Sequence, residues 1–154
     1  MSQRPYSKTE VRIANPLIKA MSRVNTWVYR ATGGRLGGRF LRGAPVLLLT
    51  TVGRKSGAPR VAPLIYLRDG EHLVLVASKG GMDHHPLWYR NLVANPDVEV
   101  QLGRDVLPMR ARTANDAERA ALWPRLLEVY RDYADYQART ARQIPVVILS
   151  PRAS

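Results

Sequence analysis

Three cationic side chains lie close together in a turn that follows an apolar segment: Arg54, Lys55 and Arg60. The turn contains glycine and proline, and apolar runs flank it at residues 45–52 and 61–67, a pattern typical of a β-hairpin. Because burying an unpaired charge is costly, these cations need either solvent or an anionic partner. The residue types therefore leave two interpretations open, a solvated turn and a binding site for an anion.

A hydroxyl group, a cation and two glycines follow the end of another apolar run, in the segment Ser78–Gly81. Glycine allows the backbone to approach a ligand closely, so this segment is a second candidate contact. An ordinary glycine turn is the alternative. Further along, Trp88 and Asn91 lie three residues apart and share one face of an expected helix, which is more typical of a core than of a site.

Three tyrosines recur at every third residue: Tyr130, Tyr133 and Tyr136. Each combines an apolar ring with a polar hydroxyl. The row is therefore compatible with the edge of a core, with an interface, or with the lining of a pocket for a planar ligand.

Several kinds of chemistry are disfavoured. The two adjacent histidines of Asp83-His84-His85 cannot easily serve one metal ion, and no second cluster of ligands accompanies them. The segment Gly53–Ser56 lacks the spacing of a phosphate-binding loop. Three histidines give no convincing Ser–His–Asp set, and the absence of cysteine excludes a thiolate nucleophile. We therefore expect no metal and no hydrolytic triad.

The net charge of +12 is concentrated at the start of the chain. Residues 1–60 contain 12 Lys and Arg and one acid, Glu10, whereas residues 61–154 contain 12 Lys and Arg and 11 acids. This asymmetry indicates a polyanionic partner, which could be nucleic acid, an anionic membrane or a polyanionic cofactor. Nucleic acid is the weakest of these candidates, because the cations do not interleave with aromatic residues along a recognised groove motif.

Periodicity and turn residues predict a single domain of mainly β structure with some helix. Short strands joined by hairpins argue for an antiparallel barrel of about six strands. Helices are expected to pack outside it, including a basic amphipathic helix that begins at Asn15-Pro16 and ends at Gly33-Gly34. Residues 1–40 form a basic N-terminal segment and residues 45–150 the barrel. The expected strands are 45–52, 60–68, 72–78, 98–102, 106–113 and 144–149, and the later helices are 86–93 and 115–142, the second interrupted or restarted at Pro124.

Longer motifs resemble the deazaflavin-dependent nitroreductase family of actinobacteria. The matching runs are 21–27, 48–60, 77–81, 86–96 and 144–147. The resemblance implies a split β-barrel that binds reduced coenzyme F420, an 8-hydroxy-5-deazaflavin with a phosphodiester and an oligoglutamate tail. It further implies hydride transfer to a quinone or a nitroaromatic acceptor. One member of the family has an aromatic residue where Ile65 stands, which leaves nitroimidazole reduction open.

The resemblance also implies roles for individual residues. The implied catalytic residues are Ser78, Tyr130, Tyr133 and Tyr136. The implied cofactor-binding residues are Arg54, Lys55, Ser56, Arg60, Val61, Ala62, Pro63, Leu64, Ile65, Val76, Ala77, Ser78, Lys79, Leu87, Trp88, Tyr89, Arg90, Asn91 and Tyr133.

Alternatives to a reductase are a non-catalytic deazaflavin carrier and a basic nucleic-acid-binding module. No apolar stretch approaches the roughly 18–20 residues that span a bilayer, and the N-terminus lacks the apolar region of a secretory signal. We therefore expect a cytoplasmic protein. The basic segment is compatible with peripheral binding to the anionic inner face of the cell membrane.

Overall fold

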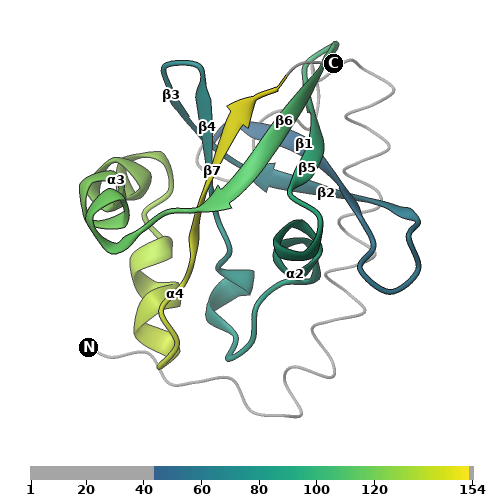
Figure 1. The fold of residues 1–154 in the computed structure, drawn as a ribbon. Coiled ribbons are helices and arrows are strands. Elements are labelled where there is room, and N and C mark those ends of the chain that lie inside the picture. Colours follow the sequence, from purple (N-terminus) through teal and green to yellow (C-terminus); the bar gives the residue numbers. More distant parts are fainter. Residues whose placement is uncertain (1–43, 153–154) are drawn as a thin grey trace.

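The structure, a computed structural model, describes residues 44–152, and within them seven strands form one sheet (Figure 1). Every neighbouring pair in the order β2-β1-β5-β6-β7-β4-β3 is antiparallel. The expected N-terminal helix lies outside the described residues. The strands are β1 (Val46–Val52), β2 (Pro59–Ile65), β3 (Leu67–Asp69), β4 (His72–Val76), β5 (Asp97–Leu102), β6 (Asp105–Thr113) and β7 (Val146–Pro151).

The sheet curls because its two edge strands are consecutive in the chain. β2 lies at one edge beside β1, and β3 lies at the other edge beside β4. Only Tyr66 separates them, and its N–H donates to the carbonyl of Pro45 at 3.2 Å. The prediction of one strand over 60–68 is therefore wrong, because this run must leave β1 and reach β4. The predicted antiparallel barrel is confirmed, with seven strands in place of six.

Two apolar layers lie on opposite faces of the sheet. The first cluster gathers alternate residues of five strands, such as Leu73 and Leu75 of β4, and lies inside the barrel. The second contains the intervening residues, such as Val74 and Val76, and lies between the sheet and two helices. Because successive side chains of a strand point to opposite faces, β4 is buried on both sides.

The helices lie outside the barrel, as the sequence predicts (Figure 1). They are the short 3-10 turn η2 (Lys79–Gly81) and the α-helices α2 (Leu87–Ala94), α3 (Asp116–Val129) and α4 (Tyr133–Arg139). A reciprocal capping box fixes the start of α3: the Asn115 side chain accepts from the N–H of Glu118, and the Glu118 side chain accepts from the N–H of Asn115.

The expected break at Pro124 is wrong, because α3 continues through this residue. Proline removes one backbone hydrogen bond, but Leu122 and Leu126 on either side of it are both buried in the second cluster. The helix ends instead at Tyr130, whose backbone is extended. This break allows both Tyr130 and Tyr133 to enter the second cluster.

Among residues 44–152, no helix is long and apolar enough to cross a bilayer.

Candidate functional site

The strand registers bring the predicted site segments to one end of the barrel. β1 ends at Val52 opposite the start of β2, and β4 ends at Val76 opposite the start of β7. Because every neighbouring pair is antiparallel, the end of β6 at Thr113 and the start of β5 lie here too. The turn between β1 and β2 and the segment after β4 therefore leave the barrel at the same end.

Helix α2 crosses this end, which we call the α2 end (Figure 1). The Tyr89 hydroxyl lies 2.9 Å from the Thr113 hydroxyl at the end of β6. The Asn91 amide donates to the Thr51 hydroxyl of β1 at 3.2 Å. Leu92 enters the first apolar cluster, so α2 is both packed and hydrogen-bonded in place.

The turn between β1 and β2 is closed by its own backbone. Gly53 donates its N–H to the carbonyl of Ala58 at 2.8 Å and accepts from the N–H of Gly57 at 2.8 Å. The Ser56 hydroxyl accepts from the N–H of Ala58 at 3.2 Å. A Cβ on Gly53 would lie 2.7 Å from this hydroxyl oxygen, which explains the glycine. Ser56, a predicted cofactor residue, thus already stabilises the turn.

Asn91 ties the cationic turn to α2. Its Oδ1 accepts from the backbone N–H of Arg54 at 3.1 Å, and its side chain is 6% exposed. The side chains of Arg54, Lys55 and Arg60 are exposed. Within residues 44–152, none of the ion pairs found includes these three cations. Arg54 and Lys55 lie on this fixed turn and Arg60 lies at the start of β2 opposite Thr51, so the three cations share one end of the barrel, where they can bind an anion.

The segment after β4, which we call the 77–85 loop (residues 77–85), contains three consecutive residues with left-handed backbone. Lys79, Gly80 and Gly81 have φ angles of 46°, 64° and 81°. A Cβ on Gly81 would lie 2.5 Å from the carbonyl oxygen of Tyr136. Gly81 therefore allows the loop to approach the backbone of α4 closely. This role agrees with the second interpretation of the segment Ser78–Gly81, an ordinary glycine turn.

Lys79 is held by the loop's own histidine. Its Nζ lies 2.7 Å from Nε2 of His84, and Nδ1 of His84 lies 3.1 Å from a carboxylate oxygen of Asp83. Lysine can only donate, so Nε2 of His84 accepts and its Nδ1 donates to Asp83. This hydrogen bond is the main reason why the pKa of Asp83 is lowered.

Arg142 was missed by sequence reasoning, although it makes the most contacts with the 77–85 loop. Its Nη2 donates to the carbonyl of Ser78 at 2.7 Å and its Nε to that of Met82 at 2.8 Å. Its Nη1 donates to the carbonyl of Ala77 at 3.2 Å and to Nδ1 of His85 at 3.0 Å. The sequence carries no signal for this role, because the contacts span about 57 to 65 residues along the chain.

The tyrosine row forms an aromatic cluster in the second apolar layer. Tyr130 and Tyr133 are each 4% exposed, and Tyr136 is half-buried. The three rings contact one another, and the hydroxyls of Tyr130 and Tyr136 lie 3.1 Å apart. Burial raises the pKa of both Tyr130 and Tyr133. The row is thus a core edge, and its contact with a cofactor stays a prediction.

The remaining predicted residues divide by exposure. Val76, Ala77 and Ser78 are all buried. The β2 segment 61–65 is half-buried at the edge of the sheet, while Trp88 and Tyr89 pack on the first cluster. Leu87 and Arg90 are exposed on α2.

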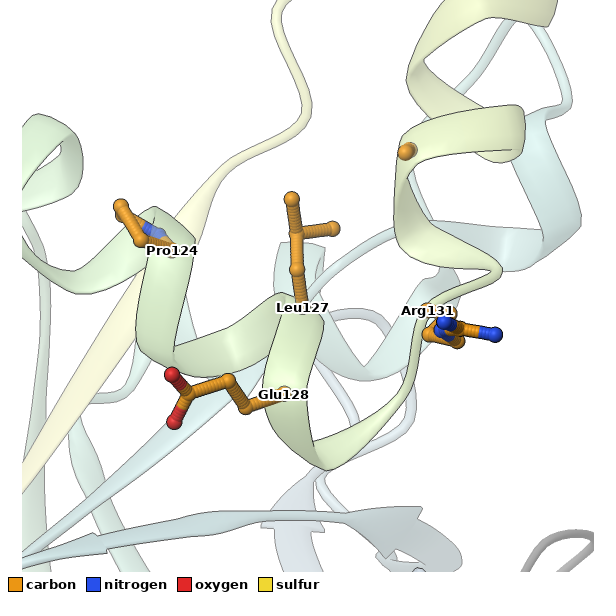
Figure 2. Close-up of a pocket in the computed structure, with 5 residues that line it drawn as sticks. Pro124, Leu127, Glu128 and Arg131 are labelled. Carbon is orange, nitrogen blue, oxygen red and sulfur yellow. The ribbon is translucent and has the colours of Figure 1, made fainter.

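An open hollow of about 410 Å³ lies elsewhere, on the outer helices (Figure 2). It is lined by Pro124, Leu127, Glu128, Arg131 and Ala134. None of these is a predicted site residue, so the hollow does not coincide with the candidate site.

Fold and site together define a small antiparallel barrel that presents fixed cations beside α2. Residues 21–151 match the family described as F420H(2)-dependent quinone reductase. The chain belongs to this family.

Individual relatives agree with the family assignment. A protein of Mycobacterium tuberculosis strain H37Rv named for the same activity is 48% identical over 118 residues, which cover 77% of this chain and 99% of the relative. An F420H(2)-dependent quinone reductase of the same strain is 44% identical over 133 residues, covering 84% of this chain and 89% of its own length. A solved F420-H2 dependent reductase superposes with a TM-score of 0.64 at 46% identity, covering 69% of this chain and 94% of that chain.

Proposed function

We propose that this chain transfers hydride from reduced coenzyme F420 to a quinone. The observation that carries the proposal is the family match over residues 21–151. The three cations without an acidic partner among residues 44–152 fit the phosphate and carboxylates of this cofactor. When bound, the deazaflavin supplies two electrons as hydride, because carbon replaces the central nitrogen of a flavin ring.

The protein binds the cofactor and orients its ring toward the acceptor. Arg54, Lys55 and Arg60 bind the anionic part of the cofactor, and Asn91 fixes the turn that carries Arg54 and Lys55. Ser78, which lies two residues beyond the end of β4 and directly before η2, and the Tyr136 hydroxyl are the polar groups assigned to the ring and the acceptor. Because Tyr133 is buried, it supports this arrangement from the second apolar layer.

The binding part of the proposal is tested by fluorescence titration with coenzyme F420 and with flavin mononucleotide. Charge-assisted hydrogen bonds contribute about 1.5–3 kcal/mol each, so Lys55→Ala or Arg60→Ala should weaken F420 binding about ten-fold or more. Arg110→Ala is the matched control, since Arg110 is exposed and paired with Asp97 at 3.0 Å. Equal or tighter binding of flavin mononucleotide would contradict the proposed cofactor.

Nitroaromatic compounds are a second class of acceptor that the proposed site admits. Ile65 is half-buried on the edge strand and packs against the second cluster, so it offers no aromatic face for stacking. We expect quinones to be reduced faster than nitroimidazoles, and Ile65→Tyr to reduce this difference. Parallel assays with a quinone and with a nitroimidazole measure the ratio of the two reduction rates in the parent and in Ile65→Tyr.

Association with an anionic membrane follows from the charge of residues 1–60, which hold 12 Lys and Arg and one acid. Each basic residue near an anionic surface contributes about 1 kcal/mol, and lipid quinones reside in that membrane. Binding to anionic vesicles should fall with salt and exceed binding to neutral vesicles. Equal recovery with both vesicles in a co-sedimentation assay would reject this part of the proposal and leave the reductase unaffected.

A further inference from the structure

The conformation of the 77–85 loop depends on contacts from outside the loop as well as on its own residues. Lys79 has a φ of 46°, which a residue with a side chain rarely adopts. Such a conformation persists only where surrounding contacts over-determine it. The carbonyls of Ala77 and Ser78 before Lys79, and that of Met82 after it, all accept from one guanidinium, that of Arg142.

This guanidinium reaches the loop from the segment between α4 and β7. Gln137 of α4 donates to the carbonyl of Arg142 at 2.8 Å, and its Oε1 accepts from the N–H of Ile144 at 2.9 Å. These hydrogen bonds of Gln137 fix the backbone around Arg142 independently of the contacts that the Arg142 side chain makes with the loop. One rigid cation thus sets the direction of the peptide groups on both sides of Lys79.

We propose that Arg142 is a positioning residue of the candidate site, which orients Ser78 and Lys79 through the backbone of the 77–85 loop. The inference rests on the proposed function. It assigns a role to a residue that acts on the loop through hydrogen bonds to its carbonyls and needs no contact of its own with the cofactor.

His85 makes this positioning sensitive to pH. Its Nδ1 accepts from Nη1 of Arg142 at 3.0 Å, which requires the neutral ring with its proton on Nε2. The charged and titratable groups that face it are Arg142, Arg90 of α2 and its neighbour His84, and the Tyr89 ring contacts it edge-on at 4.9 Å. None of these groups favours a second proton on His85.

The direction of the pH effect follows from these neighbours. Burial, and then the positive charges of Arg142 and Arg90, lower the pKa of His85. As the pH falls through this pKa, the ring becomes a cation beside Arg142 and the contact breaks. We therefore expect the positioning to be intact near neutral pH and to weaken in acid.

The experiment compares Arg142→Gln with Arg152→Gln in a fluorescence titration with coenzyme F420. Arg152 is the matched control, because its guanidinium also donates to two backbone carbonyls, that of Met109 at 3.0 Å and that of Val98 at 3.4 Å, which belong neither to the 77–85 loop nor to the contacts of Gln137. We expect Arg142→Gln to weaken binding about ten-fold or more and Arg152→Gln to stay within about three-fold of the parent.

Two further variants keep the test decisive if Arg142→Gln does not fold. Arg142→Lys retains the charge but offers one donor group in place of the planar fork, so binding should weaken while the titration midpoint of His85 stays low. His85→Asn retains an acceptor that does not titrate, so F420 binding should change less than in the parent between about pH 7 and about pH 5. His84 is present in both proteins, so the difference between them reports His85.

NMR titration of the His85 ring in the protein without cofactor gives a reading that does not depend on activity. In Arg142→Gln the midpoint should rise, because a neighbouring positive charge has been removed. An unchanged midpoint, or equal losses of F420 affinity in the Arg142 and Arg152 variants, would overturn the positioning role. If the parent itself fails to bind F420, the proposed function fails, and the His85 midpoint still decides whether Arg142 and His85 are coupled.

Discussion

Asn91 allows the link between the α2 end and the cationic turn to be tested by a single substitution. Its side chain accepts from the N–H of Arg54 at 3.1 Å and donates to the buried hydroxyl of Thr51 at 3.2 Å. Each such hydrogen bond contributes about 0.5–1.5 kcal/mol net. Asn91→Ala removes both and leaves the Thr51 hydroxyl without this donor, so we expect a loss of about 2 kcal/mol in the free energy of unfolding.

The loss is measured by urea unfolding, and it corresponds to a fall in Tm of about 4–8 °C for a chain of this size. Affinity for coenzyme F420 should fall as well, because the backbone of Arg54 loses its anchor. Asn95→Ala is the matched control, since Asn95 ends the same helix with an exposed side chain, and it should change neither quantity. If Asn91→Ala stays within about 0.5 kcal/mol of the parent, Asn91 does not position the turn.

Three further predictions concern the loop, a helix cap and the acceptor. Gly81→Ala should destabilise the fold more than Gly70→Ala in thermal unfolding. Both residues have positive φ, but a Cβ at position 81 would lie 2.5 Å from the Tyr136 carbonyl oxygen, whereas a Cβ at position 70 would meet nothing within 4 Å. Equal losses would show that the close approach of Gly81 to α4 does not matter for stability. Hydrogen bonds from Arg112, and then from the backbone of Asn115, lower the pKa of Glu118 from 4.5 to about 2. Its ionised form therefore stabilises the fold above pH 4.5, and this contribution disappears as the pH falls to about 2. Glu118→Gln should thus lower the Tm at neutral pH, with the difference closing over that window, and a difference that persists at pH 2 would contradict the sign. Ser78→Ala should lower quinone turnover with F420 affinity within about three-fold of the parent, and unchanged turnover would remove Ser78 from the catalytic residues.

Local signals predicted the hairpins and most element boundaries. Gly57 and Gly70 have positive φ in the turns that follow β1 and β3, a backbone conformation that glycine adopts readily in a hairpin turn. The predicted helix start at residue 115 likewise agrees with α3, which Asn115 caps. These features depend on neighbours a few residues away, which the sequence displays directly.

Features that depend on distant residues could not be predicted in the same way. The break at Tyr66 follows from the closure of the sheet, because β2 and β3 pair with different strands. The buried position of Tyr133 depends on where α4 packs, and the contacts of Arg142 join segments about 60 residues apart. The family resemblance identified the cofactor class, but it could not show that Asn91 and Arg142 hold the two loops in place.

Hydride transfer itself is tested most directly by mixing the protein with reduced coenzyme F420 and the quinone menadione and following the absorbance of the oxidised cofactor. We expect protein-dependent oxidation that saturates with both substrates and falls in Arg60→Ala at limiting cofactor, with Arg110→Ala unchanged. Tight binding of F420 without oxidation by menadione or other quinones would indicate a carrier and would contradict the proposed reaction.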